Sequence, residues 1–391
     1  MEKTLSLAQK EKEYMIAMRR EFHQNPEPSS EEFNTCRRVV EELEKIGLSP
    51  KVVCGTGVMV EIEGKEKGRT IALRADMDAL SVQELNDVPY KSKVDGLMHA
   101  CGHDGHTATL LGVARILNEC RNELRGKVRL LFQPAEETGV GAPAMVAAGL
   151  LDDADASLGI HLWSGVKTCT ISLEAGPRMA AASMFRYKIT GKPGHGALPH
   201  EGVDAGLAAS AVVLNFQSIV SREFPATKPL VITVGKISSG SRWNVIASEA
   251  VIEGTVRCFD AEIFRQVPDV MWRVVKETAA AYRCEAEILE VRTLTLPCVN
   301  PEKASARAAA AAKKLFGEEG ISLYPLQMGA EDYSYMMEKV PDSLIAFVGI
   351  GNPEKGSDVP HHAGNFQIDE DALPVSAAFY AQYAIDYLNE E

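Results

Sequence analysis

Four apolar runs, each with the length of a buried strand, are distributed along the chain. They are TIALRA (70–75), KVRLLFQ (127–133), ASLGIHL (156–162) and SLIAFVGI (343–350). Stretches with helical character separate several of them, notably residues 105–120 and 306–316. Near-continuous apolar strands that alternate with helices predict an α/β fold, in which a mainly parallel sheet is covered by helices on both faces.

The pattern changes between about residues 180 and 296. Half-exposed strands are expected at 184–190, 230–237, 249–259 and 286–293, and helices at 203–223 and 261–283. The resulting order, β-α-β-β-α-β, is that of a ferredoxin-like α+β module. Because the buried-strand pattern resumes afterwards, we expect a domain at residues 181–296 inserted between two parts of a main domain, residues 1–180 and 297–391.

Composition narrows the classes of partner. The 391 residues carry a formal net charge of −13, spread along the chain, so we expect no nucleic-acid partner, which would need a concentrated basic face. No run of about 18 apolar residues occurs, so we expect no membrane span. The start, MEKTLSLAQKEKEYM, lacks the apolar core of a signal peptide, and the eight cysteines are scattered. We therefore expect a cytoplasmic protein with mostly reduced thiols.

Histidines concentrate near the ends of the predicted buried strands, the edge at which open parallel sheets bind ligands. The densest segment is MHACGHDGHTA, residues 98–108. Cys101 and His103 are two residues apart, so an extended backbone or a turn can direct both at one centre. A thiolate and an imidazole suit Zn²⁺ or a similar metal ion.

Acidic residues follow two of the same strands. In FQPAEE, Pro134 ends a strand and Glu136 and Glu137 follow; one carboxylate can bind a metal while the other takes a proton from water. A solvated acidic loop is the alternative. RADMDAL places Asp76 and Asp78 at the same edge, either to orient metal ligands or to cap a helix.

Further histidines complete the expected centre. GIHLWS places His161 at another strand end, and HHAGNF supplies His361 and His362. Together with the cysteine and the glutamates, they offer about five ligands for two adjacent metal ions that keep open positions.

The inserted module carries its own polar motifs. In GKPGHGALPH, His195 lies between glycines, and SRWNVI and GTVRCF add Arg242, Asn244 and Arg257. An imidazole can stabilise an oxyanion and an arginine can hold a carboxylate. The alternative is a surface loop with incidental polar groups.

The chain resembles the bacterial and plant amidohydrolase family that contains hippurate hydrolases, indole-acetyl-amino-acid hydrolases and related aminoacylases. The resemblance extends from RREFHQNPEPSSEE to FQIDEDAL. It rests on eight motifs in order: RADMDAL, MHACGHDGHTA, FQPAEE, GIHLW, GHGALPH, SRWNVI, GTVR and MGAEDYSYM.

This resemblance implies roles for individual residues. Two divalent metal ions, Mn²⁺ or Zn²⁺ with Co²⁺ and Ni²⁺ as further options, would be bound at the sheet edge by Cys101, His103, Glu137, His161 and His362. Glu136 would be the general base and Asp78 would orient the centre. In the inserted lid, Asn244 and Arg257 would contact substrate, and His195 would reach the partner's active site in a homodimer formed through the lid.

The predicted reaction is hydrolysis of the amide bond of N-acyl amino acids. Ser81, Ala247 and the AGN after His362 depart from the usual family residues, which affects the expected shape of the substrate pocket rather than the reaction. A dipeptidase or carboxypeptidase could use the same centre. A deaminase would favour H-x-E and P-C-x-x-C motifs, which the sequence lacks, and a metal-stabilised binding protein would have no use for the second glutamate.

Overall fold

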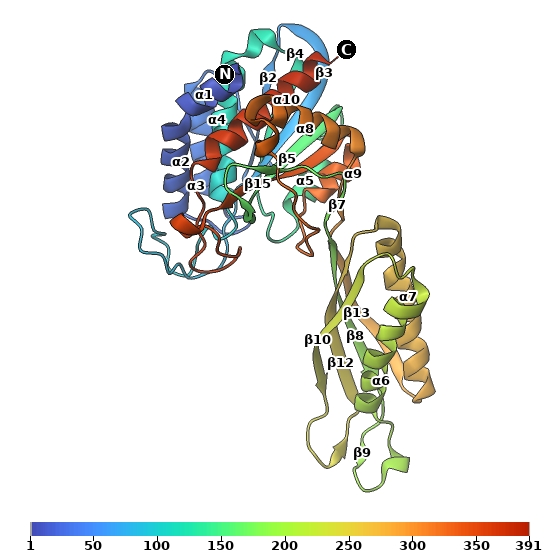
Figure 1. Cartoon of the computed structure of the whole chain (residues 1–391). Coiled ribbons are helices and arrows are strands. Elements are labelled where there is room, and N and C mark those ends of the chain that lie inside the picture. The colour runs from blue at the N-terminus through green and yellow to red at the C-terminus, as the bar shows by residue number, and fades with distance from the viewer. Residues whose placement is uncertain (1, 391) are drawn as a thin grey trace. The chain divides into compact units, whose positions relative to one another are not determined.

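The computed structural model describes residues 2–390 and consists of two compact units (Figure 1). Unit 1 comprises residues 2–178, 299–326 and 332–390, and unit 2 comprises residues 179–298 and 327–331. A short segment after the insertion thus groups with unit 2. The interpretation of unit 1 as catalytic and of unit 2 as a lid and dimerisation domain stays a prediction.

Unit 1 is built on a seven-stranded sheet with the order β1-β2-β4-β3-β5-β15-β6. Its strands are β1 (Lys51–Val53), β2 (Gly57–Glu63), β3 (Glu66–Asp76), β4 (Arg125–Gln133), β5 (Ala156–Lys167), β6 (Ile171–Ser172) and β15 (Ser343–Gly351). The four central strands pair in parallel, whereas the edge strands pair antiparallel with their neighbours. The prediction of a mainly parallel sheet is confirmed.

Helices pack on both faces of this sheet. They are α1 (Lys3–Lys10), α2 (Lys12–Gln24), α3 (Phe33–Lys45), α4 (His103–Glu119), α5 (Gly141–Ala147), α8 (Glu302–Phe316), α9 (Ser334–Lys339) and α10 (Ala372–Asn389). Gly105 of α4 lies directly against Leu162 of β5, which leaves no room for a Cβ. Gly159, also in β5, lies against Tyr333, just before α9. Since neighbouring strand residues point to opposite faces, positions 159 and 162 show that α4 and Tyr333 cover different faces.

The strand order creates a crevice at one edge of the sheet. From β3 the chain continues through α4 to β4 on one side, whereas β15 pairs with β5 on the other side. Between β3 and β5 the connections therefore leave in opposite directions, which is the topological switch point at which open α/β sheets bind ligands. The segments after β3 and β4 both begin at this edge.

Unit 2 is a ferredoxin-like module, as the sequence predicts. Its elements in chain order are β8 (Ala181–Thr190), α6 (Ala205–Ser218), β10 (Leu230–Ser239), β12 (Glu249–Cys258), α7 (Ala261–Ala281) and β13 (Glu285–Thr295). The strands form an antiparallel sheet with the order β10-β12-β8-β13. The core between this sheet and its two helices includes Phe185, Tyr187 and Phe216.

Two pairs of short strands complete the description. β9 (Gly194–His195) and β11 (Val245–Ile246) pair antiparallel, and β7 (Gly176–Met179) pairs with β14 (Cys298–Asn300). Within residues 2–390, no helix is long and apolar enough to cross a membrane.

Candidate metal centre

The carboxyl end of β3 carries Asp76, which is fully buried. Its Oδ1 accepts a hydrogen bond from Nδ1 of His106 at 2.6 Å, and its Oδ2 lies 2.7 Å from Nη1 of Arg74. Burial opposes ionisation, but Arg74 and the neighbouring histidines outweigh it and hold the pKa of Asp76 well below its usual value. Asp76 is therefore an ionised group whose charge unit 1 already compensates.

Asp78, two residues further on, binds the segment that carries the paired glutamates. Its two carboxylate oxygens accept hydrogen bonds from the backbone N–H groups of Glu136 and Glu137, each at 3.1 Å. Ser29 Oγ donates to the same carboxylate at 2.6 Å. His103 Nδ1 lies 2.9 Å from the Asp78 carbonyl oxygen. Asp78 thus joins the loop after β3, the loop after β4 and the start of α4.

The start of α4 brings Cys101 and His103 together. Gly102, between them, has φ +95°, a left-handed conformation that glycine adopts without strain, and the helix begins at His103. The sharp turn directs the thiol and the imidazole to the same side of the loop. Both residues are buried.

His161 and His362 approach Cys101 from two other parts of unit 1. Nε2 of His161 lies 3.6 Å from Cys101 Sγ. His362 has φ +65°, unusual for a residue with a side chain, and its N–H donates to the Ala100 carbonyl at 2.8 Å. This bond ties the loop of His362 to the loop of Cys101.

The position of His161 corrects one expectation. The sequence places it at a strand end, but it lies inside β5, which continues to Lys167 because β15 pairs with it along that length. The pairing of β5 with β3 ends earlier, at Gly159. His161 is therefore beyond the end of its neighbouring strand, which keeps its side chain at the crevice.

The five residues that the resemblance implies as ligands form two groups that share Cys101. One consists of Cys101, His103 and His161, the other of Cys101, Glu137 and His362, and the ligand atoms in each lie within 4.8 Å of one another. Glu137 Oε1 lies 3.5 Å from His362 Nε2. Ligand bonds of 2.0–2.3 Å in tetrahedral geometry place neighbouring ligand atoms roughly 3.3–3.8 Å apart, so these spacings fit a metal site.

The hydrogen bonds of the histidines also suit metal ligation. Nδ1 of His161 contacts the Leu162 carbonyl at 2.8 Å, as Nδ1 of His103 contacts that of Asp78. A carbonyl accepts only from an N–H, so in the neutral form of each ring, the form that binds a metal, Nε2 carries the lone pair. Nε2 of His103 and Oε1 of Glu137 are buried and make no hydrogen bond to the described residues. Such buried atoms need a partner, and a divalent cation would be one.

His106 is a residue whose role the sequence analysis did not assign. It forms a third group with Asp76 and His103. However, its Nδ1 is bonded to Asp76, and its Nε2 accepts from the Leu162 N–H at 2.8 Å, so both nitrogens are already engaged. His106 therefore connects β3 to β5 beside His161. The sequence signal that could have indicated His106 is its position three residues after His103 at a helix start, since this spacing places both side chains on one face.

Protonation in this cluster depends on burial. Burial raises the pKa of Glu137 to about 7, against the opposing effect of His103. Burial and the nearby Glu137 carboxylate raise the pKa of the Cys101 thiol well above its usual value. A bound cation must displace these protons, so metal binding is favoured by a rise in pH.

Glu136 lies beside the cluster. One of its carboxylate oxygens forms a group with His103 and Glu137, and Oε1 accepts from the Asp332 N–H at 3.3 Å. Glu136 is half-buried. Its carboxylate is thus held next to the proposed ligands while part of it stays open to water, an arrangement suited to proton transfer.

A buried ion pair stabilises the first turn of α4. Arg19 Nε donates to Asp104 Oδ2 at 2.7 Å, and Nδ1 of His23 lies 2.8 Å from the same oxygen. Arg19 and Asp104 are both buried, so removing either would take the nearest partner from a buried charge, leaving Arg19 with Glu370 or Asp104 with His23. This contact fixes the residue that follows His103.

The residues that the sequence singles out in the insertion lie in two places within unit 2. β9 and β11 pair His195 with Val245, and Gly196 N donates to the Asn244 carbonyl at 2.9 Å, so His195 and Asn244 lie close together. His195 is exposed, as its glycine neighbours predict. Oδ1 of Asn244 and Nη1 of Arg257 are buried without a hydrogen bond to the described residues.

Arg257 lies far from His195 along the sheet of unit 2. β12 begins at Glu249 beside the end of β8, and β9 follows beyond that end of the sheet (Figure 1). Arg257 is eight residues further along β12, which corresponds to about 26 Å at the usual rise of a strand. Within one chain, His195 and Arg257 therefore cannot contact the same small molecule.

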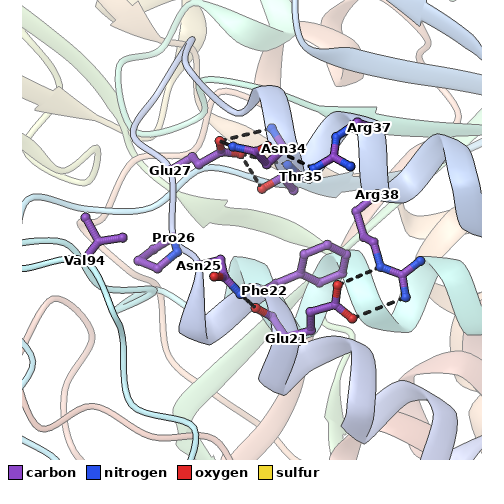
Figure 2. Close-up of a pocket in the computed structure, with 10 residues that line it drawn as sticks. All are labelled: Glu21, Phe22, Asn25, Pro26, Glu27, Asn34, Thr35, Arg37, Arg38 and Val94. Carbon is purple, nitrogen blue, oxygen red and sulfur yellow. Dashed lines mark hydrogen bonds and ion pairs between the residues drawn. The ribbon is translucent and has the colours of Figure 1, made fainter.

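A separate surface cavity of 550 Å³ lies at α2 and α3 of unit 1 (Figure 2). It contains none of the candidate ligands. Arg38, which lines it, is paired with Glu21, with Nε to Oε1 at 2.7 Å, and Glu27 accepts from the start of α3. Its charged groups are already engaged by neighbouring residues, so we assign it no part in the chemistry.

Comparison with known proteins decides the family. The model of peptidase family M20/M25/M40 matches residues 72–386, which include all five candidate ligands. The chain belongs to this family. The M20 assignment agrees with the resemblance to amidohydrolases read from the motifs, which is thereby confirmed, and the chain is an enzyme of the hydrolase class.

Named relatives of this M20 chain cover almost its whole length. It is 41% identical to an N-acetyl-L-cysteine deacetylase of Bacillus subtilis, over 96% of this chain and 89% of the relative. It is 37% identical to thermostable carboxypeptidase 2 of Saccharolobus solfataricus, over 97% and 96%. The crystal structure of YxeP from B. subtilis, described as a dinuclear metal binding peptidase of the M20 family, matches with a TM-score of 0.86 and 34% identity, over 97% and 99%.

Since Cys101 belongs to both ligand groups of this M20 chain, its loss should affect both ions. We expect Cys101→Ser to lower the metal content from about two ions per chain to less than one, because a hydroxyl replaces a thiolate in both sites. His362→Ala should keep about one ion. Elemental analysis of the purified proteins measures this. Cys169→Ser, at a half-buried cysteine outside the cluster, is the control, and equal metal content in the two cysteine variants would contradict the shared role.

Proposed function

We propose that this chain hydrolyses the amide bond of N-acyl amino acids to a carboxylic acid and an amino acid, with two divalent cations bound around Cys101. The observation that carries the proposal is the pair of ligand groups that share this thiol, with Glu136 beside them. Activity of the N-acetyl-L-cysteine deacetylase that is 41% identical supports the substrate class.

The residues of the centre divide the chemical work. Two divalent cations, when bound, would polarise the amide carbonyl and lower the pKa of water. Glu136 takes the proton from the attacking water and returns it to the leaving amine. Asp78 fixes the backbone of Glu136 through its hydrogen bond to the N–H, and the Asp332 N–H holds the carboxylate in place. Because these hydrogen bonds restrict the backbone and the carboxylate of Glu136, little rearrangement precedes proton transfer.

The donor set favours two metals. A thiolate and imidazoles suit Zn²⁺, whereas carboxylate ligands suit Mn²⁺. We propose Zn²⁺ or Mn²⁺ as the ions in the cell, with Co²⁺ and Ni²⁺ as substitutes that the same ligands accept. The absence of any disulfide among the eight cysteines supports a reducing, cytoplasmic location.

We also propose that the enzyme is a homodimer formed through unit 2. His195 and Arg257 lie too far apart in one chain to serve one substrate. Two chains resolve this. One copy contributes Arg257 to an active site, and the other copy contributes His195 or Asn244 to the same site. Arg257 would hold the substrate carboxylate, and His195 would stabilise the oxyanion.

A carboxypeptidase or dipeptidase is the second candidate, favoured by the 37% identity to a carboxypeptidase. N-acetyl amino acids, N-benzoyl amino acids and dipeptides assayed with the same metal-loaded preparation separate the two. We expect kcat/KM to be highest for an N-acyl amino acid. A dipeptide or a longer peptide cleaved more efficiently than every acyl substrate would instead establish the peptidase.

Removal of the base should separate catalysis from metal binding. We expect Glu136→Gln to keep the metal content of the parent and to lower kcat by about 10²–10⁴, since an amide cannot accept the proton. Glu137→Gln is the matched control at the neighbouring position and should lose metal. Turnover of an N-acyl amino acid by Glu136→Gln at the parent rate would show that another group is the base.

Mixed dimers test whether His195 acts across the subunits. We expect His195→Ala and Glu136→Gln each to be nearly inactive, and equal co-expression to restore about a quarter of the parent activity, because half of the dimers then contain one complete site of two. Co-expression of Glu136→Gln with Glu137→Gln should restore nothing, as both act within one chain. A monomer by light scattering, or no recovery in the first mixture, would refute the dimer proposal.

A further inference from the structure

The turn that carries Glu136 and Glu137 is held by two buried carboxylates. Three consecutive backbone N–H groups, those of residues 135–137, donate to them. Asp78 accepts the bonds from Glu136 and Glu137 at 3.1 Å, and Oε1 of Glu32 accepts the bond from Ala135 at 2.8 Å. Asp78 belongs to the crevice, but Glu32 lies in the loop before α3, a segment to which the proposed reaction gives no role.

The backbone at Ala135 explains why this turn needs support. Ala135 has φ +52°, in the left-handed region that a residue with a Cβ adopts at an energetic cost. Such conformations persist where surrounding contacts enforce them, and they concentrate at active sites. The hydrogen bond from the strained residue to Glu32 is one of these contacts.

Glu32 itself is held rigidly. Its side chain is fully buried. Oε1 also accepts from the Ser30 N–H at 2.8 Å, and Oε2 accepts from the Thr56 hydroxyl. All these partners are neutral donors, so the contacts of Glu32 to them depend on the placement of its oxygens more than on its charge. Burial accordingly raises the pKa of Glu32.

The same short loop supports the turn twice. Ser29 donates to Asp78, which binds the N–H groups of Glu136 and Glu137, and Glu32 binds that of Ala135. The four residues 29–32, which directly precede α3, therefore set the position of the segment that carries the proposed base, Glu136, and the proposed ligand, Glu137. A shift of this loop would displace the two glutamates together.

We propose that Glu32 is a positioning residue of the metal centre, which fixes the turn at Ala135 so that Glu136 faces the substrate and Glu137 faces the metal ions. The proposal rests on the proposed function for the role of Glu136. The property of Glu32 that matters is the length of its side chain, since a carboxylate oxygen must come within hydrogen-bond distance of the Ala135 N–H.

Two substitutions separate reach from charge. Glu32→Gln keeps the length and an oxygen for the Ser30 and Ala135 N–H groups, while its amide can donate to the Thr56 hydroxyl. Glu32→Asp keeps the charge but shortens the side chain by one methylene, which withdraws the oxygens by about 1.5 Å. Glu42→Asp is the matched control, because Glu42 is a buried glutamate of α3 that binds Arg38, Lys45 and Tyr14 away from the centre.

We expect kcat of the metal-loaded Glu32→Gln enzyme to stay close to that of the parent, and kcat of Glu32→Asp to fall about 10²-fold with KM little changed, because misplacement of a catalytic group by about 1 Å acts on the transition state. Glu42→Asp should lose thermal stability without this loss of kcat. The proposal is overturned if Glu32→Gln loses as much activity as Glu32→Asp, if neither loses any, or if Glu42→Asp loses as much.

Metal affinity provides a readout that needs no activity. Competition between each protein and a chromogenic chelator for Zn²⁺ should show about 10–100-fold weaker binding by Glu32→Asp than by the parent, as for other residues that orient a ligand, and near-parent binding by Glu32→Gln. Equal affinity in all three proteins would overturn the role at Glu137. If the parent cleaves no N-acyl amino acid, the proposed function fails, whereas this ranking still decides the role of Glu32.

Discussion

Burial of three carboxylates, those of Asp76, Asp78 and Glu137 at the ends of β3 and β4, is the constraint on which the arrangement of unit 1 depends. Asp76 is compensated by Arg74 and His106, and Asp78 by the backbone N–H groups of the glutamate turn. Glu137 is compensated less: its buried Oε1 makes no hydrogen bond to the described residues, and burial outweighs the nearby His103 and raises the pKa of Glu137 to about 7. Together with the buried thiol of Cys101, it is the group whose charged form most needs a cation.

This constraint explains why so many segments meet at one crevice. The strand order places the end of β3 between β4 and β5, and α4 begins at the same edge with His103. His103 and His161 each donate the Nδ1–H to a backbone carbonyl, so the fold leaves Nε2 of these two rings available. Within the ferredoxin-like unit, His195 and Arg257 lie too far apart to contact one small molecule, which is the physical argument for the proposed second copy.

Much of this organisation is encoded in local patterns. The apolar runs predict the four parallel strands, and the alternating strands predict the module of unit 2, because burial on two faces or on one produces different periodicities. The motif around Cys101 predicts that Cys101 and His103 lie close together, since the single glycine between them suffices for the turn. Family resemblance supplies the remaining partners, which are separated by up to hundreds of residues.

Other features depend on contacts that no local pattern reveals. Helix α10, which is apolar on nearly all sides, was not predicted, because its periodicity disappears when every face is buried. His161 lies inside a strand rather than at its end, since β15 extends the pairing of β5. Glu32 looks like an ordinary loop glutamate in the sequence, and only its bond to the strained Ala135, more than 100 residues away, indicates a function.

The most direct test of the metal centre is anomalous diffraction from crystals of the metal-loaded protein, recorded at the absorption edge of the bound metal. The account predicts two peaks, each within about 2.5 Å of Cys101 Sγ and roughly 3.5–4 Å from the other, one beside His161 and one beside His362. A single peak, or peaks away from Cys101, would contradict it.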